Sequence, residues 1–239
     1  MVRLNKYLAM CELGSRRSVE KYIESGRVSV NGKIADDLST QVDIDKDTVC
    51  LDGKKLTPEQ DKYYLIMNKP PKYIVSKDEQ FGRKTVFELI PDLAEKVFAV
   101  GRLDYHSEGL LILTNDGELA NKLMHPTHKI PKVYKVVVAD NLNSEQIDKL
   151  RKGIVLDGKK TLPAQVHYKE SKPGSMRLRM VIYEGKNRQI RRMIEAVGSK
   201  VLELKRLQIG PVKLGKLPRG MWRPMTPREI GELKKRINR

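Results

Sequence analysis

The order of strand-like and helical patterns restricts the fold of this chain more than any other feature of its sequence. Apolar and β-branched runs typical of strands recur along the chain, without a regular strand-helix-strand repeat. We therefore expect an α+β fold with a mixed, mostly antiparallel sheet flanked by helices. The strand-like runs are YYLIMN (63–68), KVFAVGRL (96–103), LLILT (110–114), VYKVVVA (133–139), MRLRMVIY (176–183) and KVLELKRLQIG (200–210), and the helical patterns are GELANKLMH (117–125), SEQIDKLRKG (144–153) and RQIRRMIEAVG (188–198).

The first sixty residues have the pattern of a small module with two helices and strands. A helix that begins near Leu4 can end at Gly14, because glycine tolerates the left-handed conformation of a helix end. Ser15 can cap a second helix, which Gly26 can end. The sequence VNGK then predicts a tight hairpin between two strands.

The segment LTPEQDKYY (56–64) is polar, contains a proline and precedes an apolar strand-like run, which is typical of a linker. We expect a small N-terminal domain over residues 1–60. A larger domain should occupy residues 61–239.

The net charge of +17 points to a polyanionic partner, since neutralising phosphates and releasing their counterions is what such an excess favours. The excess is concentrated in residues 184–239. In the N-terminal module, five cations lie off the apolar helix faces and are candidates for contacts with an RNA backbone, although a solvated helix surface would have the same pattern. They are Arg3, Lys6, Arg16, Arg17 and Lys21.

Several other classes of protein are disfavoured. The chain has no apolar stretch of membrane-spanning length and no signal-peptide pattern, so we expect a cytoplasmic protein. Cys11 and Cys50 are isolated and read as small thiols in a reducing compartment. His125 and His128 flank a proline without a nearby third ligand, so we expect a loop there and no metal site.

One carboxylate stands at a strand junction. Asp104 follows the apolar run that ends at Leu103 and begins the loop DYHSEG, after which the chain returns as the wholly apolar LLILT. Loops held by buried strands are where rigid catalytic groups are usually mounted, although a turn aspartate bonded to its own backbone is an alternative. Asn115, with Glu118 three residues later, is expected to cap the next helix.

A basic helix is predicted at residues 188–198. Its apolar residues recur at helical spacing and define a buried face. At about 100° per residue, Arg191 falls at the border of that face, where its guanidinium can enter a cleft and keep a partly buried aspartate ionised. Arg188 is the alternative if the helix is rotated.

Four segments together resemble the successive motifs of RsuA-type ribosomal RNA pseudouridine synthases. They are NKPPKYIVS, GRLDYHSEGLLILTNDG, KVYKV and GKNRQIRRMIEAVG with the following LKRLQIGP. The N-terminal sixty residues resemble the S-four RNA-binding domain that these enzymes carry, so the resemblance covers nearly the whole chain. Two positions depart from the family pattern: Lys72 replaces a usual glycine, and Ser107 stands where threonine is commoner.

The resemblance implies a site-specific conversion of uridine to pseudouridine in ribosomal RNA without a cofactor. Asp104 matches the catalytic aspartate, which either attacks the anomeric carbon or abstracts the neighbouring ribose proton. Arg191 matches the arginine that pairs with this aspartate. Tyr134 matches a tyrosine that lies against the flipped uracil, and Arg102 could fill the gap left in the RNA or form a backbone salt bridge.

The basic helix region also supplies candidate contacts to RNA, namely Lys186, Arg188 and Arg192. We expect a monomer that acts on ribosomal RNA or a ribosomal subunit precursor, with large-subunit RNA weakly preferred. A non-catalytic RNA-binding assembly factor with the same fold is the alternative, but it does not explain why Asp104, Tyr134 and Arg191 all stand in their motifs. A methyltransferase would need a glycine-rich loop after its first strand, and we find none.

Overall fold

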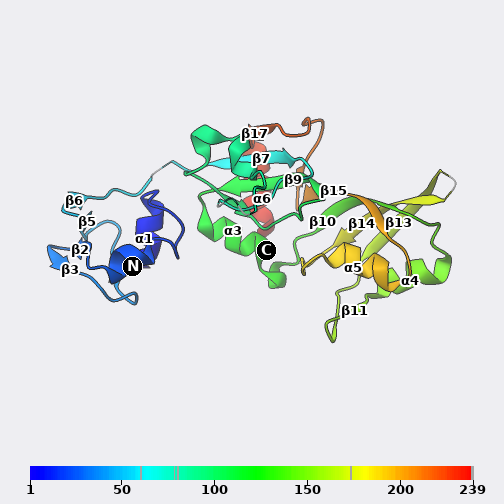
Figure 1. The fold of residues 1–239 in the computed structure, drawn as a ribbon, viewed down its shortest axis with the longest axis horizontal. Coiled ribbons are helices and arrows are strands. Elements are labelled where there is room, and N and C mark those ends of the chain that lie inside the picture. Colours follow the sequence, from blue (N-terminus) through cyan, green and yellow to red (C-terminus); the bar gives the residue numbers. More distant parts are fainter. Residues whose placement is uncertain (60, 78, 80, 173, 238–239) are drawn as a thin grey trace. The chain divides into compact units, whose positions relative to one another are not determined.

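The computed structural model describes residues 1–59, 61–77, 79, 81–172 and 174–237, without the side chains of 169–172. Its contacts divide the chain into two compact units, Met1–Lys62 and Tyr63–Arg239 (Figure 1). Gln60, where the sequence predicts the domain boundary, lies outside the described residues. Each unit is described separately below.

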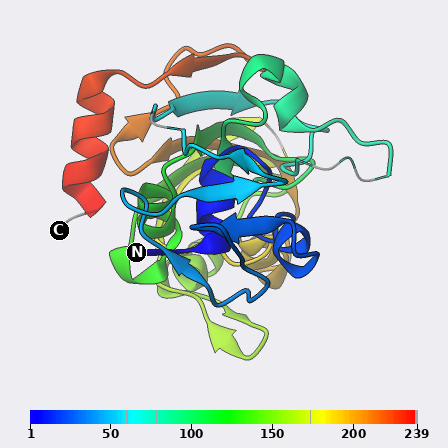
Figure 2. The same ribbon diagram turned by 90° about the vertical axis from the view of Figure 1, so that its left-hand side faces the viewer.

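The first unit packs two helices against short strands, drawn in blue in Figure 2. Its four-stranded sheet has the order β3-β2-β5-β6, and β1 pairs with β4. Leu4, Leu8 and Ile23 are fully buried in the core between helices and strands. The elements are β1 Val2–Arg3, α1 Leu4–Met10, α2 Glu20–Glu24, β2 Val28–Val30, β3 Lys33–Ile34, β4 Gln41–Val42, β5 Val49–Leu51 and β6 Lys54–Lys55.

The hairpin predicted from VNGK is confirmed, since Asn31 and Gly32 both adopt positive φ between β2 and β3. The helix ends differ from the prediction. The first helix stops at Met10, and Glu12 rather than Gly14 takes the left-handed conformation, with φ of 62°. The hydroxyl of Ser15 accepts a hydrogen bond from the Ser18 amide, but only turns follow, and regular helix begins five residues later.

The second unit is built on one large sheet with the order β13-β14-β10-β15-β9-β7-β17. Among the described strands of this sheet, β9 pairs with β15 in parallel and the other pairs are antiparallel, which confirms the mixed, mostly antiparallel sheet. The strands are β7 Tyr64–Lys69, β8 Phe98–Val100, β9 Glu108–Thr114, β10 Lys132–Val138, β11 Val155–Leu156, β12 Lys159–Lys160, β13 Gln165–Lys172, β14 Ser175–Ile182, β15 Val201–Ile209, β16 Val212–Lys213 and β17 Trp222–Pro224.

Helices cover the two halves of this sheet separately. In one half, α4 and α5 pack on β10, β13, β14 and β15. In the other half, α3 and α6 pack on β7 and β9, whose opposite face is covered by the short 3-10 helices. The strand β9 is thus buried on both faces, which explains its wholly apolar sequence. The helices are α3 Gly117–Met124, α4 Ser144–Lys152, α5 Gln189–Ala196 and α6 Pro227–Ile237, with 3-10 helices η1 Val86–Leu89, η2 Pro91–Leu93 and η3 Pro126–His128.

Three features of this unit differ from the sequence-based expectation or were missed. The basic C-terminal segment forms α6, and Leu233 and Ile237 anchor it to the core. The sequence did not predict the edge strands β13 and β17. The sequence of β13 is too polar, and that of β17 too short, to show an apolar pattern. Asp116, not Asn115, caps α3, since its carboxylate accepts the Leu119 amide while Asn115 accepts the amide of Tyr63.

Candidate active site

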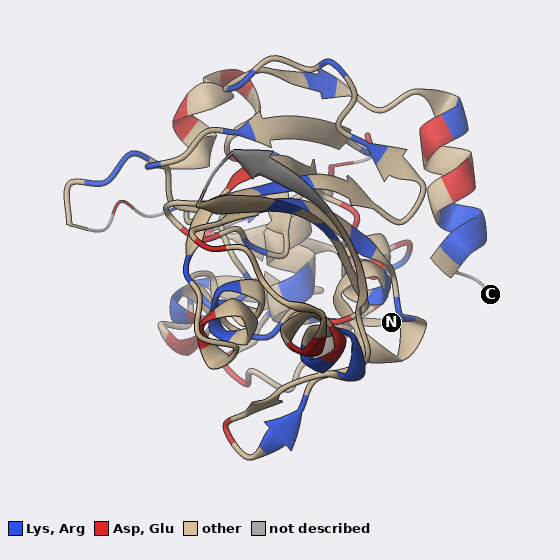
Figure 3. Cartoon of the chain, turned by 90° about the vertical axis from the view of Figure 1, so that its right-hand side faces the viewer, with Lys and Arg blue, Asp and Glu red and all other residues tan. Residues whose placement is uncertain are grey.

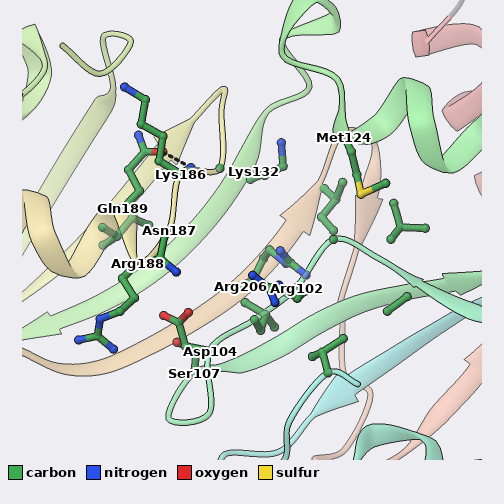
Figure 4. Close-up of a pocket in the computed structure, with 18 of the residues that line it drawn as sticks. Arg102, Asp104, Ser107, Met124, Lys132, Lys186, Asn187, Arg188, Gln189 and Arg206 are labelled. Carbon is green, nitrogen blue, oxygen red and sulfur yellow. Dashed lines mark hydrogen bonds between the residues drawn. The ribbon is translucent and has the colours of Figure 1, made fainter. Parts of the chain in front are cut away.

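A cleft of about 810 Å³ opens where the two halves of the large sheet meet. Its walls come from residues 98–104, from β10 and β15, and from residues 184–190, which form the loop before α5 and the start of that helix. Figure 4 shows Asp104 and Ser107 on one loop, with Arg102 and Arg206 beside them and Arg188 on the facing loop. The parallel strand pair of β9 with β15 lies at the same place and joins the two halves.

Asp104 lies in the turn between β8 and β9, with about a third of its side chain exposed. The backbone holds this turn in shape, since the Ser107 amide donates to the carbonyl of Asp104 at 3.0 Å. The next carbonyl, that of Tyr105, accepts the Lys72 amide at 2.7 Å. Lys72 adopts the left-handed conformation, with φ of 66°, which glycine adopts at little cost.

A fully buried lysine supports the loop that carries Asp104. The ammonium of Lys69, at the end of β7, donates to the carbonyls of Pro70 at 2.9 Å, Asp104 at 3.2 Å and Ser107 at 2.8 Å. Burial lowers the pKa of Lys69 to about 8. Sequence analysis missed this role. The position of Lys69 at the end of an apolar strand could have indicated a buried lysine, but lysines are more often exposed.

Arg191 faces Asp104 from α5 and is largely buried, with 11% of its side chain exposed. Its Nε lies 3.9 Å from Oδ2 of Asp104 and has no hydrogen-bond partner within the described chain. Its terminal nitrogens donate to the Ser107 hydroxyl at 3.4 Å and to the Val201 carbonyl at 3.5 Å. Burial and the neighbouring Arg188 lower the pKa of Arg191. The structure therefore brings together the two side chains that sequence analysis paired.

Tyr134 lines the same cleft from β10 and is 7% exposed. Its neighbour across the sheet is Arg206 of β15, a second buried cation that sequence analysis did not single out. The Nε of Arg206 donates to the Leu110 carbonyl at 2.7 Å. Gly109 makes this approach possible, because a Cβ there would lie 2.2 Å from the Arg206 carbonyl oxygen. Arg206 thus ties β15 to the strand that follows Asp104.

Lys132, two residues before Tyr134 on β10, also lines the cleft. Its ammonium donates to the Ile130 carbonyl at 3.4 Å. Burial, together with the charge of Arg206, lowers the pKa of Lys132 to about 8, and the opposing effect of Glu184 is smaller. Lys132 is thus a cleft cation that loses its charge near neutral pH.

This lowered pKa predicts a pH dependence of RNA binding. Lys132 is protonated below about pH 8 and neutral above it, and only the protonated form attracts phosphate. RNA affinity should therefore fall between pH 7 and pH 9, a window in which exposed lysines stay charged. Fluorescence anisotropy at several pH values measures this fall. Lys132→Gln should bind weakly and lose most of the pH dependence, and an equal fall in the variant would contradict the prediction.

The residues expected to contact RNA occupy different positions. Arg102, Lys186 and Arg188 line the cleft. Arg192 lies outside the cleft lining and forms a bidentate ion pair with Asp157. Its two terminal nitrogens donate to the two carboxylate oxygens at 2.8 and 2.5 Å. The five cations proposed in the first unit are all exposed, and they are Arg3, Lys6, Arg16, Arg17 and Lys21.

Two further observations concern ligands and membranes. Within the described ranges, no three His, Cys, Asp or Glu side chains gather closely enough to hold a metal ion; His125 caps the turn η3 and His128 is its last residue. None of the helices in the described part of the chain has the length and apolarity to cross a membrane.

Comparison with known proteins identifies the family. The family model described as "RNA pseudouridylate synthase" matches residues 63–196, which is more than half of the chain. The chain belongs to the RNA pseudouridylate synthase family. A second family model, "S4 domain", matches residues 2–49 and confirms the expected N-terminal domain type.

Related proteins cover nearly the whole of this family member. An "Uncharacterized RNA pseudouridine synthase" of Aquifex aeolicus is 42% identical over 99% of this chain and 95% of its own length. The "Ribosomal large subunit pseudouridine synthase B" of Bacillus subtilis is 39% identical over 98% and 96% of the two chains. The solved structure "Crystal structure of pseudouridylate synthase" has a TM-score of 0.71 at 31% identity, with 98% and 100% coverage.

Proposed function

We propose that this pseudouridine synthase converts a specific uridine of large-subunit ribosomal RNA to pseudouridine, with Asp104 as its catalytic carboxylate. The observation that carries the proposal is the carboxylate of Asp104 in a basic cleft, facing Arg191 and mounted on a loop held by Lys69. Relatives from Bacillus subtilis and Pseudomonas aeruginosa, each 39% identical, are named large-subunit synthases, which supports that choice of RNA.

The reaction breaks the bond from ribose C1′ to uracil N1, turns the base and forms a bond from C1′ to C5, with loss of the C5 proton and gain of a proton at N1. Asp104 either attacks C1′ as a nucleophile or abstracts the neighbouring ribose proton. Both routes need an ionised carboxylate. The guanidinium of Arg191, 3.9 Å away and largely shielded from water, places a positive charge beside the carboxylate of Asp104.

The target uridine must leave its stack to enter the cleft, which costs a few kcal/mol. Tyr134 lies on the cleft wall, where its ring can pack against a flipped uracil and its hydroxyl is available to assist removal of the C5 proton. Arg102 is exposed at the same cleft and is free to fill the gap left in the RNA.

Release of tritium from C5-labelled uridine tests this function directly, because the isomerisation expels the C5 proton. The substrate is ribosomal RNA, or subunit precursor particles, from cells that lack the protein. We expect release from the large-subunit material. Release only from small-subunit RNA would overturn the choice of subunit, and no release from any of these substrates would favour the non-catalytic RNA-binding factor.

Replacing Arg191 with methionine should slow isomerisation by about 10²-fold or more, since one preorganised charge beside a reacting group is worth this much. Arg191→Lys should recover part of the rate, because an ammonium restores the charge but not the bond to Ser107. Single-turnover kinetics at saturating enzyme separate this effect from RNA binding. A rate near that of the wild type in Arg191→Met would assign the supporting role to Arg188.

The exposed cations of the S4 domain should contribute phosphate contacts. Replacing Lys6, Arg17 and Lys21 together with glutamine should reduce the slope of log affinity against log salt by roughly 2, since each lost phosphate contact removes 0.7 to 0.9. Titrations of RNA at several salt concentrations measure the slope. An unchanged slope would mean that this surface does not touch RNA.

A further inference from the structure

The face of the large sheet that points away from the cleft carries its own set of cations. Side chains of a strand alternate between faces, so Lys132 and Tyr134 point into the cleft whereas Lys135 points to the other side. The same alternation in β15 puts Arg206 on the cleft side and Lys205 on the opposite one. We call Lys135, His167, Arg177, Arg179 and Lys205 together the basic face.

Four of these residues lie in one register row across four neighbouring strands. His167 of β13 is paired with Arg179 of β14, Arg179 with Lys135 of β10, and Lys135 with Lys205 of β15. Strands are about 4.8 Å apart, so the row is about 14 Å long. Figure 3 views the molecule from the end at which β13 and β14 lie and colours Lys and Arg blue.

A row of like charges destabilises the folded sheet when no anion is bound to it. Like charges directly opposite each other on antiparallel strands repel, and here Lys135 faces a cation on both sides. Two carboxylates give partial relief: Glu203 lies 3.5 Å from the ammonium of Lys135, and Glu108 lies 3.4 Å from that of Lys205. Within the described part of the chain, no carboxylate pairs with Arg177 or Arg179, and both are exposed.

We propose that the basic face is a second RNA-binding surface, which holds the phosphate backbone of a ribosomal RNA segment outside the cleft. The row of cations is matched by the regular negative charge of a nucleic-acid strand. A groove at Lys135, Arg177 and Arg179 is bordered by the exposed His167. An exposed ring next to cations suits stacking on unpaired bases.

An acidic protein is the less suitable partner. Stable protein interfaces are built around an apolar centre from which charged residues are depleted. The centre of the basic face is instead occupied by Arg179 and Lys135, the two middle residues of the row. The proposal rests on the proposed function only for the identity of the RNA, and its test requires binding but no turnover.

The test compares two variants of the full chain with the same loss of charge. The first replaces Lys135, Arg177 and Arg179 with glutamine. The control replaces three other exposed lysines with glutamine, namely Lys149, Lys152 and Lys200. The first two lie on α4, which packs on the other face of the sheet. Binding to ribosomal RNA from cells lacking the protein, and to a uridine-containing RNA of about ten nucleotides, is measured at several salt concentrations.

We expect the basic-face variant to bind the long RNA at least about tenfold more weakly, with a salt slope shallower by roughly 2, and the control to stay near the wild type. The short RNA should bind both variants alike. A charge-preserving variant, Arg177→Lys with Arg179→Lys, should keep the wild-type slope. Equal weakening in the two charge-loss variants, or no weakening in the first, would overturn the proposal. If the basic-face variant loses binding to the long RNA while the wild type releases no tritium, the second RNA-binding surface is supported and the proposed catalysis is contradicted.

Discussion

Replacing Asp104 with asparagine is expected to lower the rate of isomerisation by at least about 10³-fold. Asparagine has nearly the same shape as aspartate but can neither attack C1′ nor accept a ribose proton at neutral pH. RNA affinity should stay within a few fold of the wild type, because a carboxylate makes no attractive contact with phosphate. Tritium release under single-turnover conditions measures the rate, and anisotropy measures the affinity.

Glu108, four residues further along the same loop and strand, is the matched control for this experiment. It is a carboxylate of similar burial, but it pairs with Lys205 and Arg219 rather than facing the cleft. Glu108→Gln should therefore keep most of the activity. Substantial turnover in Asp104→Asn, or an equal loss in Glu108→Gln, would remove Asp104 from its catalytic assignment.

Replacing Lys69 with methionine is expected to lower the free energy of unfolding by about 3 kcal/mol. The buried ammonium donates to three carbonyls, and each buried acceptor left without a donor costs about 1 to 3 kcal/mol. Part of this loss is offset, because the variant no longer buries a charge. For a unit of this size, thermal unfolding should shift by about 5 to 10 °C. Calorimetry of the full chain measures the shift.

The Lys69 substitution should also affect the reaction, because two of the three carbonyls belong to the loop of Asp104. We expect a lower rate at saturating RNA even at temperatures where the variant is fully folded. Lys149→Met, at an exposed position on α4, serves as the control and should change neither melting nor rate. Unaltered melting in Lys69→Met would show that water can satisfy these carbonyls.

Some residues of the candidate site could be predicted from the sequence and others could not. Asp104, Tyr134 and Arg191 were predicted because each stands in a motif of the family that the sequence resembles, and the spacing of apolar residues in α5 also indicated the position of Arg191. Lys69 and Arg206 were missed because nothing local marks a cation as buried. Their burial depends on carbonyls that come from segments 38 and 96 residues away.

The helices and strands likewise fall into those that the sequence predicted and those that it did not. Local patterns were sufficient for the strands from β7 to β15 that have apolar sequences, for α3, α4 and α5, and for the hairpin at Asn31. They were insufficient for α6, β13 and β17. Most residues of α6 and β13 are polar and β17 has three residues, so an apolar residue such as Leu233 shows its role only where other elements cover it.

The sequence by itself determined the fold class, the family resemblance, the basic character and the candidate carboxylate, because these depend on residue type and short-range periodicity. Only the tertiary structure decided which cations reach Asp104, which are buried, and which form a row on the opposite face of the sheet. Those properties depend on strand register and on packing between distant segments. A shift of one residue in the pairing of β10 with β15 would exchange the two faces of a strand.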